Sequence, residues 1–130
     1  MKQFFAVGFC WGVWQAFKMA VKYDEFIAIA GPHPSLGVEK MLGGDDVKLA
    51  SEIRCPAFFL PAVNDPPNVK PGGEILELLA KKFGSEKTGS VEFLEMTHGW
   101  VVRGEMEDEA VCRDVNLAIK LIHEYFQKFQ

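Results

Sequence analysis

The sequence predicts an α/β fold in which a mostly parallel sheet is flanked by helices on both faces. The first observation behind this prediction is a series of short apolar segments of strand length, at residues 4–7, 25–31, 56–63 and 91–96. The second is that segments with helical hydrophobic spacing alternate with them, which is typical of parallel sheets. The third is size and composition, because 130 residues with 48% hydrophobic and 25% charged content suffice for one globular domain with a core. We therefore expect a single domain over residues 1–130.

The first part of the chain is expected to contain three strands and one long helix. Residues 4–7 are all apolar, and residues 13–23 place apolar side chains on one helical face. Residues 25–31 form a run that is apolar after Glu25 and ends before a proline-rich loop that cannot continue a strand. After a polar excursion with a short helical turn at residues 47–53, the strand at residues 56–63 stops at an Asn-Asp-Pro-Pro turn.

The last part of the chain is expected to contain two helices and one strand. A helix is predicted to end at Gly84, because apolar residues at positions 75, 79 and 83 repeat at helical spacing before it. Residues 91–96 alternate as a strand, and an apolar stripe predicts a final helix over residues 107–129.

A G-x-C-x-G motif lies between the first strand and the first helix, at Gly8-Phe9-Cys10-Trp11-Gly12. This is the nucleophile-elbow pattern, in which the nucleophile occupies a strained turn from strand to helix. Side chains two residues before and after Cys10 would collide with the turn, so we expect glycine to be required at both positions. The helix N-terminus favours the thiolate of Cys10. The motif alone fits a buried structural cysteine about equally well.

Three chemically suitable side chains follow the carboxyl ends of predicted strands, namely Cys10, Asp65 and His98. Open parallel sheets place their active sites along that edge, and the order nucleophile, acid, histidine is that of the α/β-hydrolases. The histidine would take the thiol proton, and the carboxylate would orient and stabilise the charged imidazole. Taken singly, His98 fits a structural histidine and Asp65 an ordinary turn residue, but their coincidence favours a catalytic triad.

The remaining histidines and cysteines are interpreted differently. His33 and His123 are expected to be structural or solvent-exposed, and Cys55 and Cys112 to be small packing residues. Three widely spaced cysteines argue against a disulfide framework and against a zinc site. A free nucleophilic thiol fits a reducing, cytoplasmic setting.

Charge and hydropathy argue against two classes of partner. The net charge is −4, and no dense basic patch suitable for nucleic acid occurs in the sequence. No apolar run approaches membrane-spanning length, and no signal-peptide cleavage site follows the start of the chain. We therefore expect neither a nucleic acid nor a membrane as partner.

The sequence resembles the dienelactone hydrolase family over nearly its whole length. Three segments carry the resemblance: the elbow motif, Asn64-Asp65-Pro66 and Thr97-His98-Gly99-Trp100-Val101-Val102-Arg103-Gly104. It implies an α/β-hydrolase fold and cleavage of an ester or lactone through a Cys-His-Asp triad and a thioester intermediate, without metal or cofactor. It also implies an oxyanion-hole N–H from Trp11 and substrate contacts from Arg103 and Trp100.

The departures from this family are also informative. Members usually begin with further strands that supply half of the sheet, an oxyanion-hole donor, a carboxylate-binding arginine and a glutamate near the thiol. This sequence resembles the C-terminal portion, so a partial α/β-hydrolase fold is expected. Residues 4–9 would then form an apolar edge without charge or proline, through which we expect self-association. Val13 replaces a usually small residue and is expected to crowd the first helix against the sheet.

Two other functions stay open at this level. One is a truncated, non-catalytic fragment or pseudoenzyme. The other is a glutaminase-type cysteine amidotransferase, which also uses a cysteine elbow. In that class a glutamate typically stands two residues after the histidine, and here Trp100 occupies that position, so this reading is the weaker one.

Overall fold

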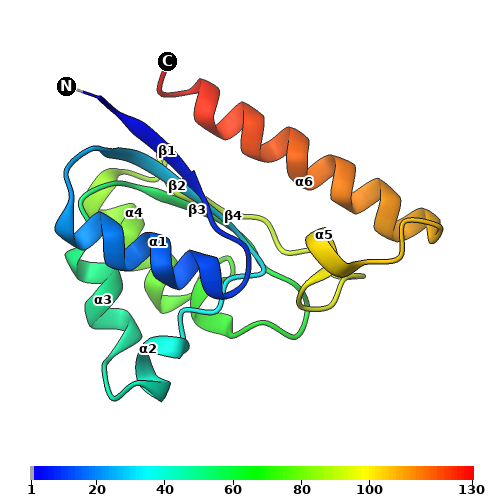
Figure 1. The fold of residues 1–130 in the computed structure, drawn as a ribbon, viewed down its shortest axis with the longest axis horizontal. Helices are drawn as coiled ribbons and strands as arrows, with labels where there is room; N and C mark the ends of the chain where they lie inside the picture. The colour runs from blue at the N-terminus through cyan, green and yellow to red at the C-terminus, as the bar shows by residue number, and fades with distance from the viewer. Residues whose placement is uncertain (1) are drawn as a thin grey trace.

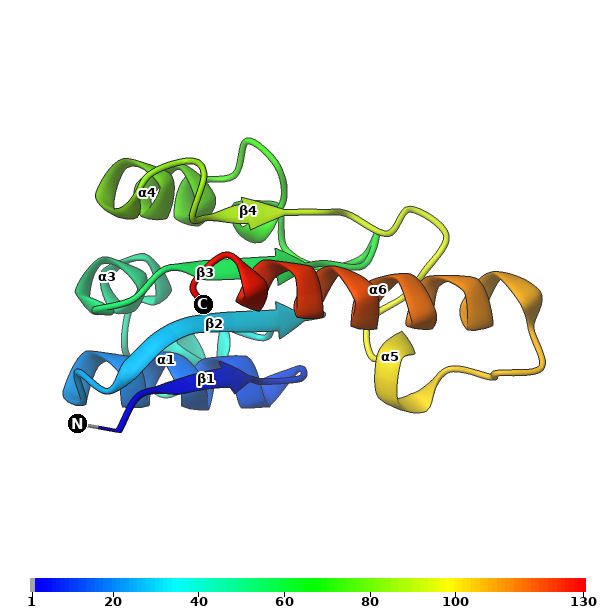
Figure 2. The ribbon, with the colours of Figure 1, turned by 90° about the horizontal axis from the view of Figure 1, so that it is seen from above.

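The computed structural model describes residues 2–130, and its centre is a parallel sheet with helices on both faces (Figure 1). Within these residues the sheet has four strands in the order β1-β2-β3-β4. All neighbouring strands pair in parallel, so their carboxyl ends meet at one edge (Figure 2). The strands are β1 (Phe4–Val7), β2 (Phe26–Pro32), β3 (Ala57–Leu60) and β4 (Gly89–Ser90). The predicted fold class is therefore confirmed.

The two faces of the sheet are covered by different helices. Helices α1 (Trp11–Lys22), α3 (Asp46–Glu52) and α4 (Glu74–Phe83) lie on one face, and α6 (Glu109–Gln127) crosses the other (Figure 1). Side chains alternate between the faces of a strand. Ile29 and Phe59 are therefore buried against the first group of helices, while Ala28 and Ala30 are buried under α6.

Val13 fits against the sheet because the facing strand residue is a glycine. Val13 is fully buried, and a Cβ built on Gly31 would lie 2.9 Å from a Val13 methyl carbon. The missing side chain of Gly31 provides the space that Val13 fills. The expected crowding of α1 by Val13 therefore does not occur, because Gly31 of β2 leaves room for the Val13 side chain.

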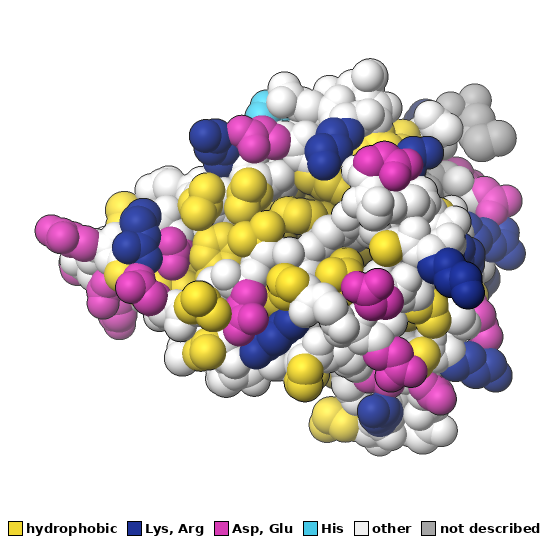
Figure 3. Space-filling model, turned by 180° about the vertical axis from the view of Figure 1, so that it is seen from behind, with side chains coloured by type: hydrophobic (Ala, Val, Ile, Leu, Met, Phe, Trp, Pro, Cys, Tyr) yellow, Lys and Arg dark blue, Asp and Glu magenta, His cyan; other side chains and the backbone are white. Residues whose placement is uncertain are grey.

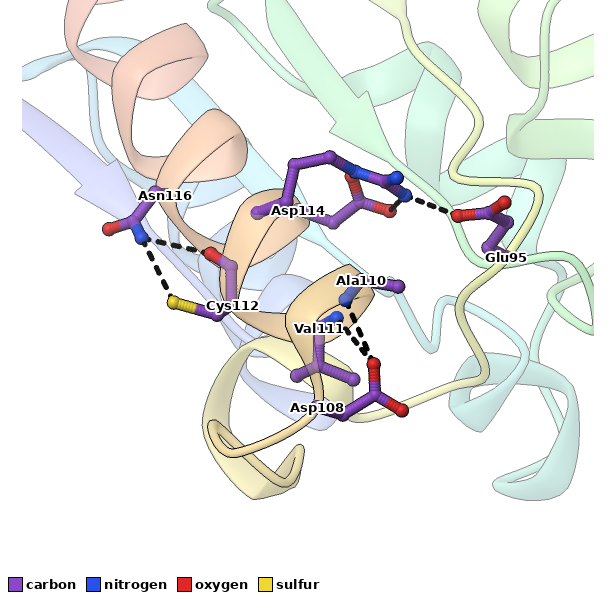
Figure 4. A network of polar contacts seen from close by, with 8 residues as sticks. Glu95, Asp108, Ala110, Val111, Cys112, Asp114 and Asn116 are labelled. Atoms are coloured by element: carbon purple, nitrogen blue, oxygen red, sulfur yellow. Dashed lines mark hydrogen bonds and ion pairs between the residues drawn. The ribbon is translucent and has the colours of Figure 1, made fainter.

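Helix α6 is tied at its start to the segment that precedes His98 (Figure 4). The carboxylate of Asp108 accepts hydrogen bonds from backbone N–H groups of the first turn of α6, which satisfies donors that have no partner within the helix. Arg113 pairs with Glu95 as well as with its neighbour in α6. The Arg113–Glu95 pair is exposed, so it joins α6 to this segment but contributes little stability.

Most predicted elements occur close to their expected positions. The first and last long helices and the short helix in the excursion are confirmed by α1, α6 and α3. Gly84 ends α4 with a φ of 100°, which a residue with a side chain rarely adopts. Three short helical segments were not predicted: α2 (Val38–Met41), the 3₁₀-helix η1 (Pro67–Val69) and α5 (Trp100–Arg103).

The strand predicted at residues 91–96 is wrong in its position, because β4 covers only Gly89–Ser90. The segment after β4 still runs beside β3, since Val91 N donates to Phe59 O at 3.0 Å and Phe93 N donates to Pro61 O at 2.9 Å. This register directs the nitrogen of Pro61 toward the same segment, but proline has no N–H to donate. The ladder therefore loses a bond, and β3 also ends earlier than predicted, at Leu60.

The face opposite that of Figure 1 carries exposed hydrophobic side chains near its centre (Figure 3). A groove of about 330 Å³ lies between residues 91–95 and α6. Leu94, in its wall, is 72% exposed. Across residues 2–130, no helix combines the length and apolarity needed to cross a bilayer.

Candidate active site

Cys10 occupies a sharp turn between β1 and α1. Its backbone has φ 58° and ψ −119°, a conformation that costs a residue with a side chain roughly 1–3 kcal/mol. Hydrogen bonds hold the turn, because Cys10 N donates to Pro32 O at 3.2 Å and Gly12 N donates to Phe9 O at 2.8 Å. The strain is therefore balanced by anchoring to β2, and Cys10 stands at the N-cap of α1.

Only one of the two motif glycines is required by steric contact. A Cβ on Gly8 would lie 2.4 Å from the backbone of Gly12, which is an impossible contact. A Cβ on Gly12 would meet no atom within 4 Å. The expectation that both positions exclude side chains is therefore confirmed for Gly8 and wrong for Gly12.

The His98 ring lies in hydrogen-bond contact with both of the other predicted side chains. Cys10 Sγ is 2.9 Å from His98 Nε2, and His98 Nδ1 is 2.6 Å from Asp65 Oδ1. Cys10 follows β1, Asp65 follows β3, and His98 follows the segment after β4. The parallel sheet brings these loops together because they all leave the same edge.

Asp65 and His98 are themselves fixed by backbone contacts. Asp65 is only 5% exposed, and its second oxygen accepts a hydrogen bond from Ala62 N at 2.7 Å. His98 N donates to Asn64 Oδ1 at 2.7 Å. Asn64 and Asp65 thus hold the backbone and the ring of the histidine from one turn.

Sequence reasoning missed Ser35 as a member of this cluster. Its hydroxyl lies 3.4 Å from Cys10 Sγ and 3.3 Å from His98 Nε2. Ser35 N also donates to Cys10 O at 3.0 Å, which joins the loop after β2 to the elbow. The signal available in the sequence was position, since Ser35 follows a predicted strand just as the other three residues do.

The contacts shift the pKa values of Cys10 and His98 in opposite directions. Burial alone would raise the pKa of the Cys10 thiol, but hydrogen bonds from Ser35, His98 and the Trp11 backbone lower it below its ordinary value. Burial alone would lower the pKa of His98, but hydrogen bonds to Cys10 and Asp65 and the Asp65 charge raise it. Both shifts favour a thiolate next to an imidazolium.

His33 lies under His98 and is a neutral part of the site. Its side chain is fully buried, and its ring centroid is 5.2 Å from those of both His98 and Trp100. Burial, and then the proximity of His98, lower the pKa of His33 to about 4. His33 therefore adds no competing positive charge at neutral pH. From the sequence, His33 is expected to be either structural or solvent-exposed, and its full burial agrees with the structural alternative.

The predicted substrate-binding residues lie beside His98. Arg103 and Trp100 line a cavity of about 290 Å³ that His98 also borders. The Arg103 side chain covers Gly99, where an added Cβ would lie 2.4 Å from its guanidinium. Trp100 is only 3% exposed and packs against Phe93, so the structure shows it as part of the hydrophobic core. The substrate roles of Arg103 and Trp100 stay predictions.

Limiting iodoacetamide is expected to alkylate Cys10 before Cys55 and Cys112. Cys10 has a lowered pKa, whereas burial raises the pKa of Cys55 to about 12 and leaves it 2% exposed. Because the thiolate is the reacting form, the Cys10 rate should reach its plateau at a lower pH than that of a free thiol. Peptide mapping by mass spectrometry measures both effects. Earlier modification of Cys55 or Cys112 would contradict the assignment of the elbow.

The sequence matches the model of a known protein family. The family model described as "Dienelactone hydrolase family" matches residues 1–129. No curated protein matches the sequence.

Solved structures are similar in fold. A protein assigned as a dienelactone hydrolase from Klebsiella pneumoniae subsp. pneumoniae MGH 78578 aligns with a TM-score of 0.63 and 14% identity, over 95% of this chain and 51% of that one. An acylaminoacyl peptidase bound to Z-Gly-Gly-Phe-chloromethyl ketone aligns with a TM-score of 0.67 and 17% identity, over 97% of this chain and 24% of that one. The Pyrococcus horikoshii acylaminoacyl peptidase aligns with a TM-score of 0.58 and 13% identity, over 89% of this chain and 23% of that one. The chain thus spans about half of the first structure and about a quarter of the two peptidases.

Proposed function

The chain belongs to the dienelactone hydrolase family, and from this premise we propose that it cleaves a carboxylic ester or lactone with Cys10 as nucleophile. The observation that carries the proposal is the continuous contact from Cys10 Sγ to His98 Nε2 at 2.9 Å and from His98 Nδ1 to Asp65 Oδ1 at 2.6 Å. A thiol, a base and a carboxylate in this arrangement are what nucleophilic acyl transfer requires.

In the proposed first step, His98 Nε2 holds the proton of Cys10, and the thiolate attacks the carbonyl carbon of the ester. The negative charge that develops on the carbonyl oxygen is stabilised by the backbone N–H of Trp11. The tetrahedral intermediate then breaks the bond to the alcohol oxygen, which receives the proton from His98. The product of this step is a thioester on Cys10 together with the free alcohol.

In the proposed second step, His98 removes a proton from water, and the resulting hydroxide attacks the thioester carbonyl. Collapse of this intermediate releases the carboxylic acid and returns the proton to the Cys10–His98 pair. Asp65 accepts the hydrogen bond from His98 Nδ1 in both steps and stabilises the imidazolium. The mechanism uses only groups of this chain and requires neither metal nor cofactor. For a lactone, the alcohol and the acid are parts of one product.

Two alternatives give different experimental results. A non-catalytic fragment would hold the same contacts without acylation. A glutaminase-type amidotransferase would form its thioester from glutamine and release ammonia. Trp100 stands at the position where a glutamate is typical of that class, which disfavours this alternative.

Incubation with p-nitrophenyl acetate is expected to leave an acetyl group on Cys10. The reason is that an activated ester transfers its acyl group to the thiolate faster than water removes it from the thioester. Acid quenching at short times, followed by peptide mapping, locates the adduct, and release of p-nitrophenolate measures turnover. A Cys112→Ala variant is the matched control and should acylate normally. Absence of an adduct on Cys10 would contradict the proposed function.

A further inference from the structure

A second cavity adjoins the candidate active site and has a volume of about 450 Å³. Its wall includes Ser35 and His98, whose side chains lie 3.4 and 2.9 Å from Cys10 Sγ. A part of the substrate bound in this cavity would therefore lie close to the carbonyl carbon that Cys10 attacks. The volume falls in the range of small-molecule sites.

The polar side chains in the wall already have partners within the protein. Asn64 accepts a hydrogen bond from the His98 backbone, and Asp65 binds the His98 ring and the Ala62 backbone. The rest of the wall is largely apolar or small, and it includes Pro34, Val38, Met41 and Pro66. A bound group would thus meet hydrocarbon surface more than free donors or acceptors.

Among the described residues, the one cationic group in the cavity wall is His98, and it is already engaged by Cys10 and Asp65. Among residues 2–130, no lysine or arginine lines it. Lys40, on the same short helix as Met41, points to Asp46 with an Nζ–O distance of 3.5 Å. Arg103 lines the other cavity beside His98. Desolvation of a carboxylate here would cost free energy that no cation offsets apart from His98, which already has two partners.

We propose that this second cavity is a subsite for an uncharged, apolar arm of the ester. The inference rests on the proposed function, since it assigns a substrate class to the same nucleophile. Substrates of this class carry a hydrocarbon chain or ring next to the scissile carbonyl and no carboxylate on that arm. The cavity discriminates against an acidic arm by desolvation, by the Asp65 carboxylate in its wall and by the lack, among the described residues, of a cation that is not already paired.

The test compares two thiol reagents with the same reactive group and nearly the same length. N-hexyl iodoacetamide ends in a methyl group, and 6-(iodoacetamido)hexanoate ends in a carboxylate. Each rate constant at Cys10, located by peptide mapping, is divided by the rate constant of the same reagent with glutathione. We expect the hexyl reagent to react at least about tenfold faster, because only the acid must bring a carboxylate out of water against the apolar wall.

Variants at two neighbouring exposed residues locate the effect. Met41 is 83% exposed and lines the cavity, while Leu42 is 69% exposed and does not. Met41→Lys should reduce the preference for the hexyl reagent about tenfold, because it adds a cation to the wall. Leu42→Lys adds the same charge at the next residue, outside the cavity wall, and should leave the ratio of the two reagents' rate constants unchanged.

The outcomes separate this subsite from the proposed function. Equal rates of the two reagents in the native protein, a preference for the acid, or equal effects of the two lysine variants would overturn the subsite. In each of these cases, selective labelling of Cys10 by iodoacetamide would still support the nucleophile. Loss of that selective labelling would contradict the proposed function itself, and the subsite with it.

Discussion

Replacement of His98 by alanine is expected to lower kcat/KM for p-nitrophenyl acetate by about 10²–10⁴-fold, the usual contribution of a positioned general base. His98 Nε2 is 2.9 Å from Cys10 Sγ, and no other histidine ring has this contact among residues 2–130. Without the imidazole, the thiol loses the group that takes its proton and the charge that stabilises its thiolate. Release of p-nitrophenolate under steady-state conditions measures the loss.

Two further variants sharpen this experiment. His123→Ala is the control, because His123 is exposed on α6 and has no place in the proposed mechanism. Cys10→Ser should also abolish turnover, since the serine hydroxyl ionises far less readily than the thiol. Turnover that survives in His98→Ala, or that falls equally in His123→Ala, would show that the measured hydrolysis does not use the Cys10–His98 pair.

The second large effect concerns assembly, and we expect the chain to self-associate through β1. Within the described residues β1 pairs with β2 alone. Phe4 N and Gly8 N donate to the β2 side, to Glu25 O and Ala30 O, so the alternate backbone groups at Phe5 and Val7 face away from the sheet. An unpaired apolar edge is a template for strand pairing with a second chain.

Val7→Lys is the variant that tests the edge, because Val7 is 43% exposed and a charge there opposes pairing. Phe5 is less suitable, since its ring stacks on Phe126 at 4.6 Å and its loss would disturb the packing of α6. Light scattering after size exclusion should show at least twice the monomer mass of 14.6 kDa for the native chain. For the Val7→Lys variant it should show the monomer mass.

A matched variant on the opposite side identifies the surface. Leu94→Lys alters the groove between residues 91–95 and α6. We expect this variant to associate like the native chain. A native chain that is monodisperse at the monomer mass would refute self-association. Dissociation by Leu94→Lys rather than Val7→Lys would assign the contact to the other edge.

The sequence by itself determined the fold class, the elbow and the order of the three candidate residues. These features depend on local information: hydrophobic period, glycine at a strained turn, and polar residues directly after apolar segments. The steric need at Gly8 and the C-terminal stop at Gly84 are local in the same sense, because each follows from backbone conformation within a few residues.

Only the tertiary structure decided which side chains meet. Ser35 is separated from His98 by 63 positions, and their 3.3 Å contact depends on how two loops leave the sheet. The end of β4 depended on Pro61, which directly follows the neighbouring strand β3 and lacks the N–H that its register required. The fit of Val13 likewise depended on Gly31 across the interface between α1 and β2. Pairing between distant segments is set by shape and hydrogen-bond satisfaction in three dimensions, and neither is a property of a local sequence window.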